Sequence, residues 1–147
     1  ANSLCVYTRV AMNSEPASHA WTFSSTTGIV GGITAFVHVD TSSIVAIENG
    51  QTTSSSLSHA APSVTTPVAN TMVVTVHSFS SAATWTPPTG MTEDVDVASQ
   101  ALGSVGIALE MNHVLQAAAG ATGTKTAVAS NDADTGNATI LALRRAP

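Results

Sequence analysis

Apolar and polar residues alternate with a period of two along much of this chain. Such runs, bounded by Gly, Pro, Asn or Ser, predict β-strands, whereas Pro, Gly and β-branched residues interrupt every helical window. The expected strands are residues 3–11, 19–24, 30–39, 43–47, 71–79, 92–98, 104–111, 124–130 and 137–144. Their number and spacing predict an all-β fold, an antiparallel two-sheet β-sandwich that is jelly-roll-like.

One expected strand differs from the others. Residues 71–79, with the sequence TMVVTVHSF, are apolar at positions that point to both faces of a sheet. A strand with one face in water would alternate more strictly. We therefore expect residues 71–79 to lie in the centre of their sheet.

Similar segments recur in the same order, which indicates an internal pseudo-repeat. Residues 3–11 resemble 104–112, and residues 31–37 resemble 137–143. Nothing before Ser3 matches residues 63–103, so the first copy is expected to be incomplete at its start. We predict one sandwich domain over residues 1–147, divided into a first copy (1–50), a Ser-rich linker that forms an exposed loop or edge (51–60) and a second copy (61–147).

Composition limits the classes of partner. Hydrophobic residues make up 44% of the chain, charged residues only 9%, and the net charge is −5. Four Lys and Arg residues form no basic stripe that could neutralise a phosphate backbone, and no apolar run reaches the ~20 residues that span a bilayer. We therefore expect neither nucleic acid nor membrane as a partner. The single cysteine, Cys5, is expected to be buried in its strand.

Tryptophan marks a candidate binding position. Trp85 precedes Pro87, Pro88 and Gly90, a rigid turn that could hold the indole at a loop tip for stacking on a sugar. The alternative is that Trp85 closes the open end of the sandwich while the prolines fix the turn. Trp21 alternates with Phe23 on one face of its strand and is expected in the core.

Other side chains give weaker indications of chemistry. Asp132 and Asp134 lie in an Asn/Asp/Gly-rich loop that could bind a glycan or accept Ca²⁺, although a plain turn explains the same composition. The five histidines are scattered without metal-ligand spacing, and the chain contains no nucleophile elbow. We therefore expect no cofactor, no metal and no enzymatic activity.

Several strings in the chain resemble β-sandwich modules of tailed-bacteriophage virions, prophage-like particles and bacterial surface proteins. They are residues 15–24 (EPASHAWTFS), 31–36 (GGITAF), 61–66 (APSVTT), 85–93 (WTPPTGMTE) and 117–124 (AAAGATGT). In that family a further stretch, with its own Trp-x-Pro-Pro-like turn, usually precedes the segment that begins here at Ala1. The resemblance implies a module that contacts other proteins rather than a catalytic one.

These observations give one leading hypothesis and one rival. The leading hypothesis is a non-enzymatic virion structural protein, a capsid decoration protein, head fibre or tail-associated component. It would pack against identical subunits and other virion or surface proteins, at the virion surface or in the extracellular medium. The rival is a carbohydrate-binding adhesin that uses Trp85 and the Asp132/Asp134 loop on host polysaccharide.

Overall fold

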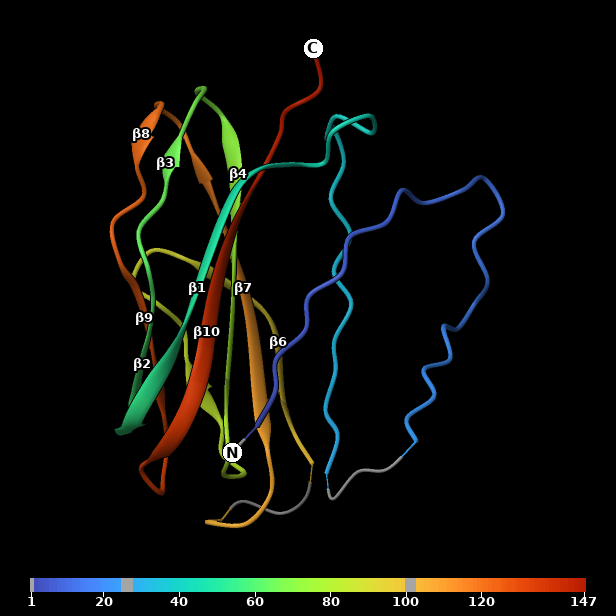
Figure 1. The fold of residues 1–147 in the computed structure, drawn as a ribbon. Coiled ribbons are helices and arrows are strands. Elements are labelled where there is room, and N and C mark those ends of the chain that lie inside the picture. The colour runs from blue at the N-terminus through green and yellow to red at the C-terminus, as the bar shows by residue number, and fades with distance from the viewer. Residues whose placement is uncertain (1, 25–27, 100–102) are drawn as a thin grey trace.

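The all-β prediction is confirmed. The computed structural model describes residues 2–24, 28–99 and 103–147, and in this part of the chain there are ten strands and no helix. A five-stranded antiparallel sheet has the order β1-β10-β4-β7-β6 (Figure 1). Its strands are β1 (Val45–Ser56), β10 (Asp134–Leu143), β4 (Thr71–Phe79), β7 (Ala108–Gln116) and β6 (Thr92–Ala98).

Shorter strands form a second layer on one face of this sheet. The three-stranded set has the order β2-β9-β5, and β3 pairs with β8. Their bounds are β2 (Ser58–Ala61), β9 (Lys125–Ala129), β5 (Trp85–Thr86), β3 (Thr65–Thr66) and β8 (Gly120–Ala121). Two hydrophobic clusters fill the space between the layers, one around Phe79 and Trp85 and one around Val73 and Ile140. The architecture is therefore that of a β-sandwich.

The central place predicted for residues 71–79 is confirmed. β4 has the predicted bounds and pairs with β10 on one side and β7 on the other. Val73 points into the sandwich, whereas Val74 points to the opposite, outer face of the five-stranded sheet. Both are buried, at 0% and 3% exposure, so the outer face is also covered. The cover comes from residues that precede β1.

Strands predicted near the N-terminus are not formed. Residues 3–11, 19–24 and 30–39 contain no strand in the described chain, apart from an isolated bridge between Val39 and Arg145. Residues 3–10 and 30–39 lie instead as extended segments beside the five-stranded sheet, whereas residues 19–24 belong to a loop farther from it (Figure 1). The alternating pattern was correct in predicting extended backbone, but these segments have no hydrogen-bonded neighbour, which a strand requires.

Two further boundaries differ from the prediction. β7 begins at Ala108 rather than at residue 104, because Gly106 adopts a positive φ of 127° that breaks the extended backbone before it. β1 extends to Ser56, beyond the predicted strand 43–47, and the Ser-rich residues 51–60 form sheet edges, which is one of the two forms predicted for them. Residues 51–56 continue β1, an edge strand, and residues 58–60 belong to β2.

Candidate interaction surface

The N-terminal layer, defined here as residues 2–10 and 28–39, is the most distinctive feature of the surface. It lies on the outer face of the five-stranded sheet, opposite β2 and β9 (Figure 1). Side chains alternate between half-buried and exposed along residues 2–7 and again along residues 34–37. Each segment therefore has an inner face on the sheet and an outer face in solvent, as a strand would have.

Residues 2–6 are held over β1 and β10. The Asn137 amide donates to the Asn2 side-chain oxygen at 2.8 Å, and the Asn2 amide donates to the Ser78 hydroxyl at 2.9 Å. Val6 packs against the cluster of Val74, Leu141 and Leu143. Polar contacts at one end and apolar contacts at the other fix this segment on the sheet.

Residues 28–39 are held over β6 and β7. The Phe36 ring meets the His113 ring edge-on, with centroids 5.7 Å apart, and Phe36 and Val39 join the cluster around Val74. At Gly32 the backbone approaches the sheet so closely that a Cβ would lie 2.8 Å from both methyl groups of Val95. Only glycine fits at this contact.

A neighbouring pair of glycines tests this close approach. We expect Gly32→Ala to lower the free energy of unfolding by about 1–3 kcal/mol, because the new methyl must displace Val95 or lift the segment. Gly31→Ala is the matched control, since nothing lies within 4 Å of its Cβ position. Urea unfolding of both variants measures the difference. Equal stability of the two would show that residues 28–39 do not rest on the sheet as described.

Large apolar side chains cover the solvent side of this region. They are Tyr7, Val10, Met12, Trp21, Phe23, Ile29, Ile33 and Val37, with exposures between 42% and 80%. The Tyr7 and Trp21 rings lie together, with centroids 5.6 Å apart. Single exposed apolar residues are normal on a surface, whereas this part of the chain exposes eight large ones, which is typical of a site of protein interaction. The buried positions predicted for Trp21 and for Cys5 are therefore wrong, since both are exposed.

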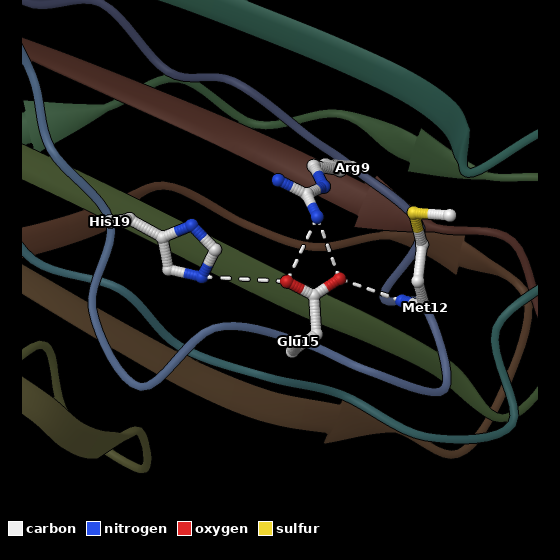
Figure 2. A network of polar contacts seen from close by, with 4 residues as sticks. All are labelled: Arg9, Met12, Glu15 and His19. Carbon is white, nitrogen blue, oxygen red and sulfur yellow. Dashed lines mark hydrogen bonds and ion pairs between the residues drawn. The ribbon is translucent and has the colours of Figure 1, made fainter.

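A polar network fixes the loop that joins the two segments. The Arg9 guanidinium donates to both carboxylate oxygens of Glu15, at 2.7 and 2.8 Å, and the Met12 backbone N–H donates to Glu15 at 2.6 Å (Figure 2). His19 lies 3.5 Å from the same carboxylate. The Met12 hydrogen bond, followed by the charge of Arg9, lowers the pKa of Glu15. These contacts give the exposed loop a defined shape.

Backbone hydrogen bonding is missing from most of the layer. In the described part of the chain, no residue from 3 to 10 or from 28 to 37 shares a backbone hydrogen bond with another residue. His38 and Val39 are the first to join the sheet, through Ala146 and Arg145. Extended backbone with free N–H and C=O groups is a template for pairing with another strand.

The indole of Trp85 lies in the core, not at a loop tip. Trp85 is 7% exposed, and its ring contacts those of Phe79 and His59 at centroid distances of 5.0 and 5.5 Å. The Asp96 carboxylate accepts from its backbone N–H at 3.0 Å. The predicted exposed indole is therefore wrong, and the alternative prediction, a tryptophan that fills the sandwich, describes its position.

Asp132 lies in the turn between β9 and β10, and Asp134 is the first residue of β10. β5, which carries Trp85, pairs with β9, so these three predicted residues come to the same end of the sandwich. Asp134 accepts from the Thr135 N–H at 2.6 Å, and Asp132 adopts a positive φ of 54°. Both features are typical of Asn/Asp turns. Across the described residues, no three His, Cys, Asp or Glu side chains form a group that could hold a metal.

Two titratable groups face each other in the core, which the sequence did not indicate. His77 on β4 and Glu110 on β7 are both 0% exposed, and Nδ1 of His77 lies 3.7 Å from Oε2 of Glu110. Burial raises the pKa of Glu110 to about 7 and lowers the pKa of His77 to about 4. Their cross-strand register brings them together, but solvent does not reach them. They are structural groups rather than an active site.

Known proteins provide no guide to this surface. No protein-family model, curated protein or solved structure matches the chain. None of the described segments is a helix long and apolar enough to cross a membrane.

The exposed N-terminal layer was not predicted from the sequence. Alternation of apolar and polar residues indicates which side chains share a face, but not whether a second layer covers that face.

Proposed function

We propose that this protein is a non-enzymatic structural component that works by packing its N-terminal layer against other protein subunits. The observation that carries the proposal is the group of exposed apolar side chains on a layer with free backbone groups. Charge also favours contact, because Arg9 and His38 are the only charged or titratable side chains, besides Cys5 and Tyr7, within residues 2–10 and 28–38. Burying neutral surface avoids the desolvation cost of charge.

We further propose that the assembly is a virion or a related particle, with the protein as a decoration, head-fibre or tail-associated component. The support for this is the resemblance of the chain to β-sandwich modules of tailed phages and bacterial surface proteins. A sandwich with an uncharged adhesive face suits such a role because surface proteins attach through preformed contacts. The carbohydrate-binding alternative gains no support, since Trp85 offers no exposed ring face.

Self-association tests the proposal. We expect the purified chain to form oligomers at high concentration, measured by sedimentation velocity. The double substitution Ile33→Asp and Val37→Asp should weaken the association at least tenfold, because apolar residues at the centre of an interface often contribute more than 1–2 kcal/mol each. Both residues are more than half exposed, so the fold should tolerate the change.

Val68→Asp is the matched control. Val68 is also an exposed valine, but it lies in the turn between β3 and β4, outside the N-terminal layer. It should leave the association unchanged. A chain that stays monomeric at high concentration and does not bind emptied virus particles would contradict the proposed function.

A further inference from the structure

A groove runs along the free edge of residues 2–6, over β1. One part, of about 600 Å³, is lined by Leu4 and Val6 on one side and by Glu48–Thr52 and Thr139 below. A second part, of about 440 Å³, continues it past Asn2 to Thr52–Ser54. Together they follow β1 from Glu48 to Ser54, a span of about 20 Å for an extended chain. The groove therefore has the length and shape of one β-strand.

The floor of the groove is low because small residues of β1 form it. Register with β10 places Glu48 opposite Leu141, Gly50 opposite Thr139 and Thr52 opposite Asn137, all on the outer face of the sheet. Gly50 has no side chain and Thr52 a short one. The floor is thus small and neutral in its middle, with a single carboxylate, that of Glu48, at one end.

The wall of the groove has free hydrogen-bonding groups. Residues 3–10 share no backbone hydrogen bond with any described residue, so the edge that faces β1 can accept a new strand. In the second copy of the pseudo-repeat, residues 104–112 correspond to residues 3–11, and β7 there pairs antiparallel with both β4 and β6. An added neighbour of residues 3–10 is expected to be antiparallel as well.

We propose that this groove binds an extended segment of another polypeptide, which pairs antiparallel with residues 2–6 above β1. Asn2 lies near Thr52–Ser54 and Val6 near Glu48, so residues 2–6 run opposite to β1 and the bound segment runs in the same direction as β1. Its N-terminal end therefore lies over Glu48. The segment has a Lys or Arg there, followed by small apolar residues on alternate positions that face Gly50, Thr52 and Ser54.

A folded second copy does not fit as the occupant. In every molecule of this protein, residues 2–6 and 28–39 already rest on that molecule's own five-stranded sheet. The groove needs a segment that is free on its inner face, such as a terminal or linker strand of a partner protein. This inference rests on the proposed function and names the kind of partner segment.

A designed peptide tests the proposal on the 147-residue chain. The probe is acetyl-Lys-Thr-Val-Thr-Val-Thr-Val-Thr-amide, whose first, third, fifth and seventh side chains match the spacing of Glu48, Gly50, Thr52 and Ser54. We expect saturable binding, with slowed hydrogen exchange by NMR at alternate amides of residues 2–6, because one edge of that segment faces the groove. A peptide with Pro at position five should not bind, since Pro removes a donor and disfavours pairing.

A charge swap provides the matched control. Glu48→Lys should weaken binding of the Lys peptide about twofold to fivefold and strengthen binding of a peptide with Glu at position one, as expected for an exposed ion pair. Glu48 is exposed, so its replacement leaves the fold intact. Equal responses of the two peptides would overturn the assigned direction of the segment.

Three further outcomes would overturn the proposal itself. They are the absence of binding by the Lys peptide, protection of β1 or β6 amides instead of residues 2–6, and protection of residues 2–6 by raised protein concentration alone. The last result would identify a second copy as the occupant and leave the proposed function standing. Loss of self-association in the Ile33→Asp and Val37→Asp variant with peptide binding retained would separate the two surfaces.

Discussion

Phe79→Ala is expected to lower the free energy of unfolding by about 4 kcal/mol, within the range seen when a buried Phe is truncated. Phe79 is 0% exposed and packs against the rings of Trp85 and His59, at centroid distances of 5.0 and 5.2 Å. Its other neighbours in the cluster are alanines, at positions 83, 108, 127 and 129. Alanine side chains cannot extend into the space that the ring leaves, so the cavity should persist.

Urea unfolding followed by circular dichroism measures this loss. Val37→Ala is the control, because Val37 is 80% exposed and its truncation should change stability by less than about 0.5 kcal/mol. A loss below about 1.5 kcal/mol for Phe79→Ala would show that the second layer of strands closes onto β4 without the ring. In that case the cluster around Trp85 would not be the main core of the sandwich.

The second large effect concerns pH and the buried pair of His77 and Glu110. The pKa of His77 falls from 6.5 to about 4 on folding, so unfolding takes up a proton below pH 6.5 and this group loses stability as pH falls toward 4. The pKa of Glu110 rises from 4.5 to about 7, so unfolding releases a proton above pH 4.5 and this group loses stability as pH rises toward 7. Between pH 4.5 and 6.5 the two slopes oppose each other.

Single substitutions should separate the contributions of His77 and Glu110 to the pH dependence of the free energy of unfolding. The wild-type protein is expected to show little net dependence on pH from this pair between pH 4.5 and 6.5. Glu110→Gln leaves the His77 slope alone, and stability should then fall by roughly 1.4 kcal/mol per unit as pH decreases. His77→Gln leaves the Glu110 slope alone, and stability should fall at a similar rate as pH increases.

Denaturant titrations at pH 4.5, 5.5 and 6.5 measure these slopes. Glutamine has the shape of a neutral glutamic acid, so Glu110→Gln should fold. The geometry agrees with a neutral pair, because Nε2 of His77 donates to the Lys125 carbonyl at 3.2 Å and leaves the unprotonated Nδ1 toward Glu110. The absence of a slope in both variants would show that both groups are charged in the folded protein, and a slope in only one variant would show that the group left in the other variant is charged.

The positions of two strands of the five-stranded sheet were predictable from the sequence. Residues 71–79 and 92–98 become β4 and β6 with the bounds predicted from alternation and turn residues. A long apolar run limited by Asn70 leaves few ways to place the strand, and Asn70 has the positive φ of 55° that such a turn requires. Local pattern and tertiary pairing agree in this part of the chain, so sequence reasoning succeeds.

The sequence-based prediction failed where strand formation or side-chain burial depends on a segment that is distant along the chain. Residues 3–11 and 30–39 carry the same alternation as real strands, but in the described chain only His38 and Val39 among them share a backbone hydrogen bond or bridge with another segment. Trp21 was expected in the core from its alternation with Phe23, and Trp85 at a loop tip or at the end of the sandwich from the turn that follows it, yet Trp21 is 60% exposed and Trp85 only 7%. A period of two fixes which side chains share a face, but burial of that face depends on segments far away in the sequence.

The sequence by itself determined that this protein is built from extended chain, that residues 71–79 lie at the centre of a sheet, and that its surface carries little charge. These properties follow from residue type and spacing alone. Only the tertiary structure decided that the outer face of the sheet is covered by residues 2–10 and 28–39, and that His77 faces Glu110. Such pairings depend on strand order and register, which bring together residues that are distant along the chain.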